Sequence, residues 1–179
     1  WVRKNGRFYT DFEGFVNDEY LAWSSDNAAI FPSRNEGQLR TGIKCYTDWL
    51  GAFVREFDQE LQDGIIVTVE AGLGPAGEMR YTSYPLRERS PVSGPIWSYP
   101  GIGEFQCYEE NMLQDLKSAA ASVGHPEWGN AGPDNAGHYD DWPYNGQSLF
   151  FTESEGVDNY RSSYGQFFLS WYSGRLIDH

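Results

Sequence analysis

Apolar residues recur at helical spacing in three stretches of the chain. Over residues 41–61 they fall three and four positions apart, which places them on one face of a helix that ends near Gly64. The same spacing predicts a helix over 109–123, and Gly124 suits its C-terminus. It also predicts a last helix over about 163–178.

Residues 65–70 form a short β-branched run with the sequence IIVTVE. The run is apolar on both faces, a pattern typical of a parallel strand buried between neighbours. A single strand of this kind cannot satisfy its own backbone hydrogen bonds. We therefore expect further polypeptide, either the remainder of the same fold or another protein chain, to pack on the strand.

Polar and turn-forming residues separate these elements. Residues 1–39 are interrupted by Gly, Asn, Ser and Asp, which predicts a long irregular surface segment. Irregular stretches over 72–103 and 125–158 predict two long loops, and the second is typical of functional loops. The order helix, strand, long loop, helix, long loop, helix predicts an α/β segment and not a self-sufficient domain.

Composition limits the classes of partner. The net charge of −13 repels nucleic acid and anionic membranes, whereas a neutral polysaccharide is unaffected. No apolar run reaches the length of a membrane span. Two cysteines are too few for a disulfide framework, so we expect Cys45 and Cys107 to be reduced and buried. The three histidines are scattered, and no spacing suggests a metal site or a cofactor.

The loop after the predicted strand holds the candidate chemistry. Ligands of parallel α/β proteins bind at the carboxyl ends of strands, where this chain places Glu70 and Glu78. The intervening glycines let the backbone approach a ligand and aim an acid. From spacing alone, a capping glutamate or one paired with Arg80 is favoured over a catalytic acid. A phosphate loop fits less well because no Gly-Lys-Ser/Thr follows.

The sequence of residues 72–85, GLGPAGEMRYTSYP, resembles the β-amylase signature around the catalytic glutamate. Further blocks resemble the same family in the same order, and they lie at residues 100–108, 124–129, 132–137 and 164–173. The resemblance covers residues 40–179 and is loose over residues 1–39. Such ordered agreement identifies the chain as a segment of this family.

The resemblance implies a partial (β/α)₈ TIM barrel and hydrolysis of α-1,4-glucan from its non-reducing ends, with release of maltose and inversion. Glu78 matches the general acid, which must hold its proton near neutrality and so needs a dry, aromatic site. Inversion also needs a second carboxylate as base. The family's base and its flexible lid lie outside this chain. Glu70 matches a supporting glutamate, and we reject it as the base.

Three aromatic residues fit the family's sugar cleft, because sugar rings stack on aromatic faces. They are Tyr84, Trp97 and Tyr99, and packing is the alternative role of each. Arg80 is a supporting residue. Thr82 departs from the family, which usually has proline there. The resemblance implies a plastid or the cytoplasm but does not choose between them.

Two hypotheses follow for the function. The first is a β-amylase-type glycoside hydrolase whose site is completed outside this chain. The second is a catalytically incomplete derivative that serves as a scaffold, an interaction subunit or a glucan-binding module. The absent base and the exchange at Thr82 motivate the second hypothesis. A second catalytic glutamate in the complete protein favours the first.

Overall fold

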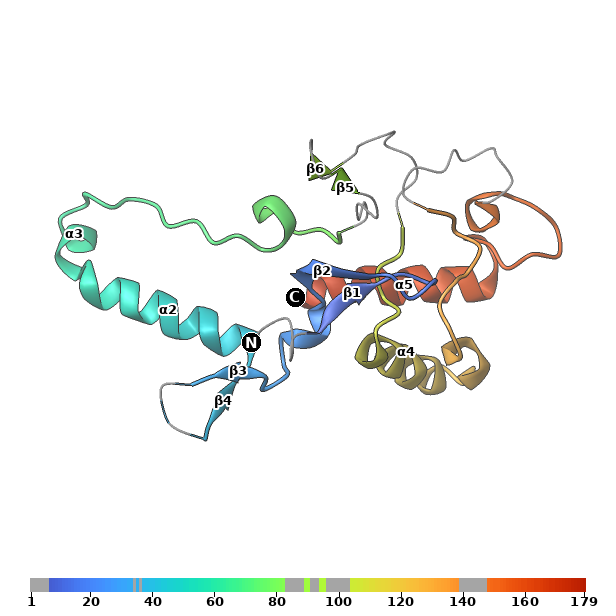
Figure 1. Cartoon of the computed structure of the whole chain (residues 1–179), viewed down its shortest axis with the longest axis horizontal. Helices are drawn as coiled ribbons and strands as arrows, with labels where there is room; N and C mark the ends of the chain where they lie inside the picture. The colour runs from blue at the N-terminus through green and yellow to red at the C-terminus, as the bar shows by residue number, and fades with distance from the viewer. Residues whose placement is uncertain are drawn as a thin grey trace.

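The computed structural model describes residues 7–33, 35, 37–82, 89–90, 94–95, 104–138 and 148–179. They form a packed body and an arm that extends from it (Figure 1). The body holds β1 (Phe8–Thr10), β2 (Val16–Leu21), α4 (Glu110–Ser122) and α5 (Ser163–Asp178). The arm holds α2 (Gly42–Glu56), α3 (Asp58–Gln62) and the extended residues 65–71.

The strands of the described residues form three small antiparallel pairs. β1 pairs with β2, β3 (Phe31–Pro32) with β4 (Leu39–Arg40), and β5 (Arg89–Ser90) with β6 (Gly94–Pro95). Short 3₁₀ turns complete the described structure. They are η1 (Trp23–Ser25), η2 (Pro75–Gly77), η3 (Pro126–Gly129) and η4 (Leu149–Phe151).

The β1–β2 hairpin corrects the expectation of an irregular surface segment over 1–39. Tyr9 and Trp23 are buried at 1% and 8% exposure, so this region contributes to the core. The fully buried Asp11 closes the hairpin turn, because its carboxylate accepts 2.9 Å hydrogen bonds from the Glu13 and Phe15 amides. The polar residues that suggested a loop serve a buried turn instead.

The helices of the body confirm the predicted positions. α5 begins after Ser162, whose side chain accepts a 3.0 Å hydrogen bond from the Gly165 amide. α4 is capped by Glu109, and Gly124 beyond its end has a φ of +84°. No described helix is both long and apolar enough to cross a membrane. The predicted 41–61 helix is divided, because Phe57 leaves helical geometry between α2 and α3.

Apolar packing between α4, α5 and the hairpin forms the core. The buried residues of α4 are Met112, Leu116 and Ala120, and those of α5 are Gly165, Phe168, Trp171 and Tyr172. A polar contact also joins the helices, since Trp171 Nε1 donates a 2.7 Å hydrogen bond to Asp115 Oδ2. The indole nitrogen is thereby satisfied at the edge of the core.

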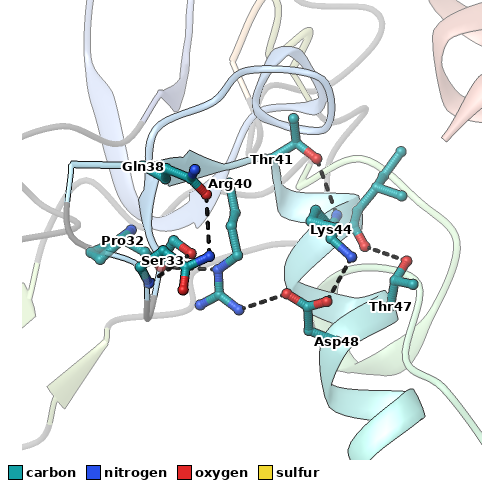
Figure 2. A network of polar contacts seen from close by, with 10 residues as sticks. Pro32, Ser33, Gln38, Arg40, Thr41, Lys44, Thr47 and Asp48 are labelled. Atoms are coloured by element: carbon teal, nitrogen blue, oxygen red, sulfur yellow. Dashed lines mark hydrogen bonds and ion pairs between the residues drawn. The ribbon is translucent and has the colours of Figure 1, made fainter.

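A polar network fixes the beginning of α2 against the β3–β4 pair (Figure 2). Arg40 and Lys44 contact the two carboxylate oxygens of Asp48 at 3.0 and 2.8 Å. Hydrogen bonds from Lys44 and Arg40 lower the pKa of Asp48. Arg40 Nε also donates a 3.0 Å hydrogen bond to the Pro32 carbonyl within the strand pair. Arg40 therefore contacts both β3 and Asp48 of α2, and it joins the strand pair to the helix.

The arm leaves its apolar surface uncovered. α2 has no buried residue, and Trp49 on its apolar face is 59% exposed. Residues 65–70 belong to no strand pair within the described chain, and Ile65 and Val67 are 72% and 83% exposed. The predicted buried strand is therefore extended but unpaired here, because no described neighbour supplies a hydrogen-bonding edge.

The two cysteines differ in accessibility. Both are free thiols, and Cys107 is fully buried as expected, whereas Cys45 is only partly buried. Burial, and then the charge of Glu109, raises the pKa of Cys107 well above its usual value. Its thiol therefore stays protonated and shielded, which makes it unreactive.

We predict that a thiol-specific reagent labels Cys45 in the folded protein and Cys107 only after unfolding. Peptide mapping by mass spectrometry, with and without urea, measures both sites. A Cys45→Ser variant controls for the assignment. Equal labelling of the two cysteines under native conditions contradicts the prediction.

Candidate active site

The loop of residues 72–82 follows the extended segment and folds back on itself around η2. The Gly77 amide donates to the Gly74 carbonyl at 2.9 Å, and the Glu78 amide donates to the Pro75 carbonyl at 3.1 Å. A Cβ at Gly74 would lie 2.4 Å from the Glu78 carbonyl oxygen. Only glycine therefore fits at this position, and the close contact sets the direction in which Glu78 leaves the loop.

The turn of this loop stores backbone strain. Ala76 has φ +56° and ψ +22°, and no other non-glycine residue of the described chain has a positive φ. A left-handed alanine costs about 1–2 kcal/mol. Gly77 follows with φ +83°, a conformation that glycine adopts freely. The pair reverses the chain immediately before Glu78.

Tyr81 fixes the far end of the loop to α5. Its ring stacks on Tyr172 with the centroids 3.8 Å apart, and its hydroxyl donates a 2.8 Å hydrogen bond to the Tyr172 carbonyl. The edges of Tyr9 and Trp23 pack against the same ring. Burial raises the pKa of Tyr81, so the hydroxyl remains a hydrogen-bond donor.

His179 fixes the near end of the loop, also from α5. Its Nε2 lies 2.8 Å from the Leu73 carbonyl oxygen, and its Nδ1 lies 2.6 Å from Asp26 Oδ2. The scattered histidines suggested no site in the sequence. Asp26, Leu73 and His179 are far apart in the chain, and no sequence motif brings them together.

Glu78 projects from the open side of the loop. Its side chain is 63% exposed, and its Oε2 lies 2.5 Å from Arg80 Nε. The paired glutamate considered from spacing is therefore present, and the dry aromatic surroundings expected of the acid are not formed by the described residues. An exposed ion pair stabilises by only about 0–1 kcal/mol, so it restrains Glu78 weakly.

Glu70 lies on the arm, beside α2. It lines a hollow of about 380 Å³ together with Tyr46, Trp49 and Leu50 of α2. Glu70 is exposed and pairs with no cation within the described chain. The hollow combines an apolar wall with a single carboxylate.

The aromatic candidates Tyr84, Trp97 and Tyr99 lie outside the described residues. No group of three His, Cys, Asp or Glu side chains in the described chain is arranged to hold a metal ion. Among the predicted residues, the structure thus brings Glu78 and Arg80 together, while Glu70 lies in the extended segment before the loop.

The sequence model of glycosyl hydrolase family 14 matches this chain over residues 2–179. The chain belongs to this family. The matched range also includes residues 2–39, where the resemblance seen in the sequence is loose.

Curated relatives of the family 14 chain cover nearly all of it. A rice (Oryza sativa subsp. japonica) protein named "Beta-amylase 2, chloroplastic" is 44% identical over 96% of this chain and 28% of the relative. "Inactive beta-amylase 4, chloroplastic" of Arabidopsis thaliana is 38% identical over 100% of this chain and 32% of the relative. The chain thus spans about a third of the length of these relatives.

A solved structure resembles this family 14 chain as well. The crystal structure of the catalytic domain of β-amylase from Paenibacillus polymyxa matches with a TM-score of 0.59 and 25% identity. The match covers 98% of this chain and 36% of that chain. The described helices and small sheets are therefore part of a TIM-barrel type of fold, as the sequence predicted.

Thr82 gives a prediction about stability. Its side chain is buried at 3% exposure, and its hydroxyl has no hydrogen-bond partner among the described residues.

Replacing Thr82 by Val removes the unsatisfied hydroxyl and keeps the shape, so we predict an increase of about 1 kcal/mol in the free energy of unfolding. The measurement is the thermal unfolding midpoint of the complete protein. Thr47→Val is the control, because the exposed Thr47 hydroxyl already donates to Ile43. A lowered midpoint for Thr82→Val contradicts the prediction.

Proposed function

We propose that this chain supplies the acid-bearing part of a β-amylase active site. The reaction is hydrolysis of α-1,4-glucosidic bonds of starch-like glucans from non-reducing ends, with release of maltose and inversion. Membership of the family supports the proposal, and so does the strained turn at Ala76 that precedes Glu78. The observation that carries the proposal is the position of Glu78 directly after the turn at Ala76 and Gly77.

In the proposed reaction the protonated Glu78 carboxyl donates its proton to the glycosidic oxygen. The bond from this oxygen to the anomeric carbon breaks, and the shortened glucan leaves as an alcohol. A second carboxylate, supplied outside this chain, removes a proton from water, which attacks the anomeric carbon from the opposite face. The two carboxyl groups must lie about 6.5–9.5 Å apart to accommodate that water.

The supporting residues have separate proposed roles. Tyr84, Trp97 and Tyr99 stack on glucose rings through their aromatic faces. Arg80 restrains Glu78, with which it is paired at 2.5 Å. Glu70, at the end of the extended segment, orders the base of the loop. No cofactor takes part in the proposed reaction.

We also propose that residues 65–70 become a barrel strand when further polypeptide packs on them, from the remaining barrel or another chain. Their exposed branched side chains and unpaired backbone support this proposal. The apolar face of α2, exposed at Trp49, is covered in the same assembly. Such burial also removes water from one side of the Glu78 loop.

The relatives support a plastid location. Both curated relatives above are named as chloroplastic. We propose the same compartment for this chain, where starch is the available α-1,4-glucan. Organelle fractionation of the source tissue tests this proposal.

A second candidate function is a catalytically incomplete scaffold or glucan-binding module. The specific observation is that one relative, 38% identical over the whole chain, is named as inactive. The exchange at Thr82 is compatible with relaxed control of the acid loop. This candidate predicts binding to starch or to another protein without maltose release.

The substitution Glu78→Gln distinguishes the two candidates. It removes the donated proton, so we predict a loss of about 10²–10⁴-fold in kcat for maltose release by the complete protein. Glu127→Gln is the matched control, because Glu127 is also an exposed glutamate paired with a basic side chain, His125. Proton NMR of the first product additionally reports β-maltose if inversion occurs.

Equal maltose release by the parent protein and Glu78→Gln removes Glu78 from its role. Absence of activity in both, together with sedimentation on starch granules, selects the glucan-binding module. Absence of both properties selects the scaffold.

The proposed strand gives a test of its own. Val67 is 83% exposed in the described chain, so Val67→Lys is nearly neutral if that surface stays free. If the segment is a barrel strand, the same change buries a charge, and we predict that it destabilises the complete protein by more than about 2 kcal/mol. Val123→Lys, at a 54% exposed helix end, is the control. Equal unfolding midpoints for both variants reject the strand.

A further inference from the structure

His179, at the C-terminal end of α5, contacts two groups that lie far from it in the sequence. Its Nδ1 is 2.6 Å from Asp26 Oδ2, and its Nε2 is 2.8 Å from the Leu73 carbonyl oxygen. Both partners are hydrogen-bond acceptors. Only the doubly protonated imidazole carries an N–H on both nitrogens, so both contacts are satisfied together in the charged form.

The surroundings suit a cation at this position. The rings of Trp23 and His179 have centroids 3.9 Å apart, which permits a cation–π contact. The side chains of His179 and Asp26 are only 20% and 19% exposed. Their ion pair is therefore less screened by water than a pair on the open surface.

Other charged groups share the hollow of about 420 Å³ that His179 lines; they are Arg7, Asp115, Arg175 and Asp178. Arg175 contacts Asp115 at 3.4 Å and Asp178 at 2.6 Å. Arg7 donates a 3.0 Å hydrogen bond to the Ser24 carbonyl. Asp26 is thus the carboxylate directed at the ring of His179.

The Leu73 carbonyl connects this pair to the acid. The Leu73 amide donates to the Gly77 carbonyl at 3.2 Å, and the Glu78 amide donates to the Pro75 carbonyl at 3.1 Å. The loop is therefore closed by its own hydrogen bonds. A displacement at Leu73 is passed on to Glu78.

We propose that Asp26 and protonated His179 form a clamp that positions the loop bearing Glu78. Both are positioning residues, since neither reaches the acid itself. The inference rests on the proposed role of Glu78.

The test replaces His179 by Ala in the complete protein. Loss of the clamp lowers kcat by about 10–100-fold, the effect of misplacing an acid by about an ångström, and changes KM much less. His125→Ala is the matched control. His125 also has a carboxylate partner, Glu127 at 2.9 Å, and a stacked tryptophan, Trp128 at 3.9 Å, but it does not touch the loop.

A structural readout separates the clamp from the chemistry. Hydrogen exchange of residues 72–78 becomes faster in His179→Ala and stays unchanged in His125→Ala. His179→Gln retains one donor, so its loop protection lies between that of the parent protein and that of His179→Ala. Asp26→Asn, a gentler change, weakens the protection in the same direction.

The proposal is overturned if folded His179→Ala keeps both the loop protection and kcat of the parent protein. It is also overturned if His125→Ala loosens residues 72–78 as much as His179→Ala does. If Glu78→Gln retains full activity, the proposed function fails, while the exchange comparison still decides whether the clamp holds the loop.

Discussion

The body of the molecule depends on the burial of Tyr172. Its carbonyl accepts from Tyr81, its hydroxyl accepts a 3.1 Å hydrogen bond from the Gln106 amide, and its ring stacks on Tyr81 and Phe168. One α5 residue therefore joins the Glu78 loop to the segment before α4. Because Tyr172 is buried, its pKa is raised and it stays neutral, so the core avoids an unpaired charge.

The arm shows the opposite condition. A backbone with both faces apolar is stable only where neighbours accept its hydrogen bonds and cover its side chains, and residues 65–70 have neither within the described chain. The Glu78 loop lies at the boundary between these two conditions. Its body side is fixed by packing and its arm side is open, which explains why the Glu78 side chain is 63% exposed.

The sequence predicted those features that depend on local physics. α5 was located because apolar residues recur at helical spacing over one segment, and Gly124 marked the end of α4. The β1–β2 hairpin was missed, because its strands are short and Asp11 resembles a loop residue until tertiary contacts bury it. The Glu78 loop was predicted from its resemblance to a family motif. The Asp26–His179 contact, which joins the two ends of the described fold, had no local signal.

Both anchors of the Glu78 loop come from α5 and its C-terminal end. Tyr81 stacks on Tyr172 and donates a hydrogen bond to the Tyr172 carbonyl, which fixes the far end of the loop. The His179 ring contacts the Leu73 carbonyl oxygen at 2.8 Å, which fixes the near end. The restraint that the loop lacks on its arm side is in this way supplied from α5.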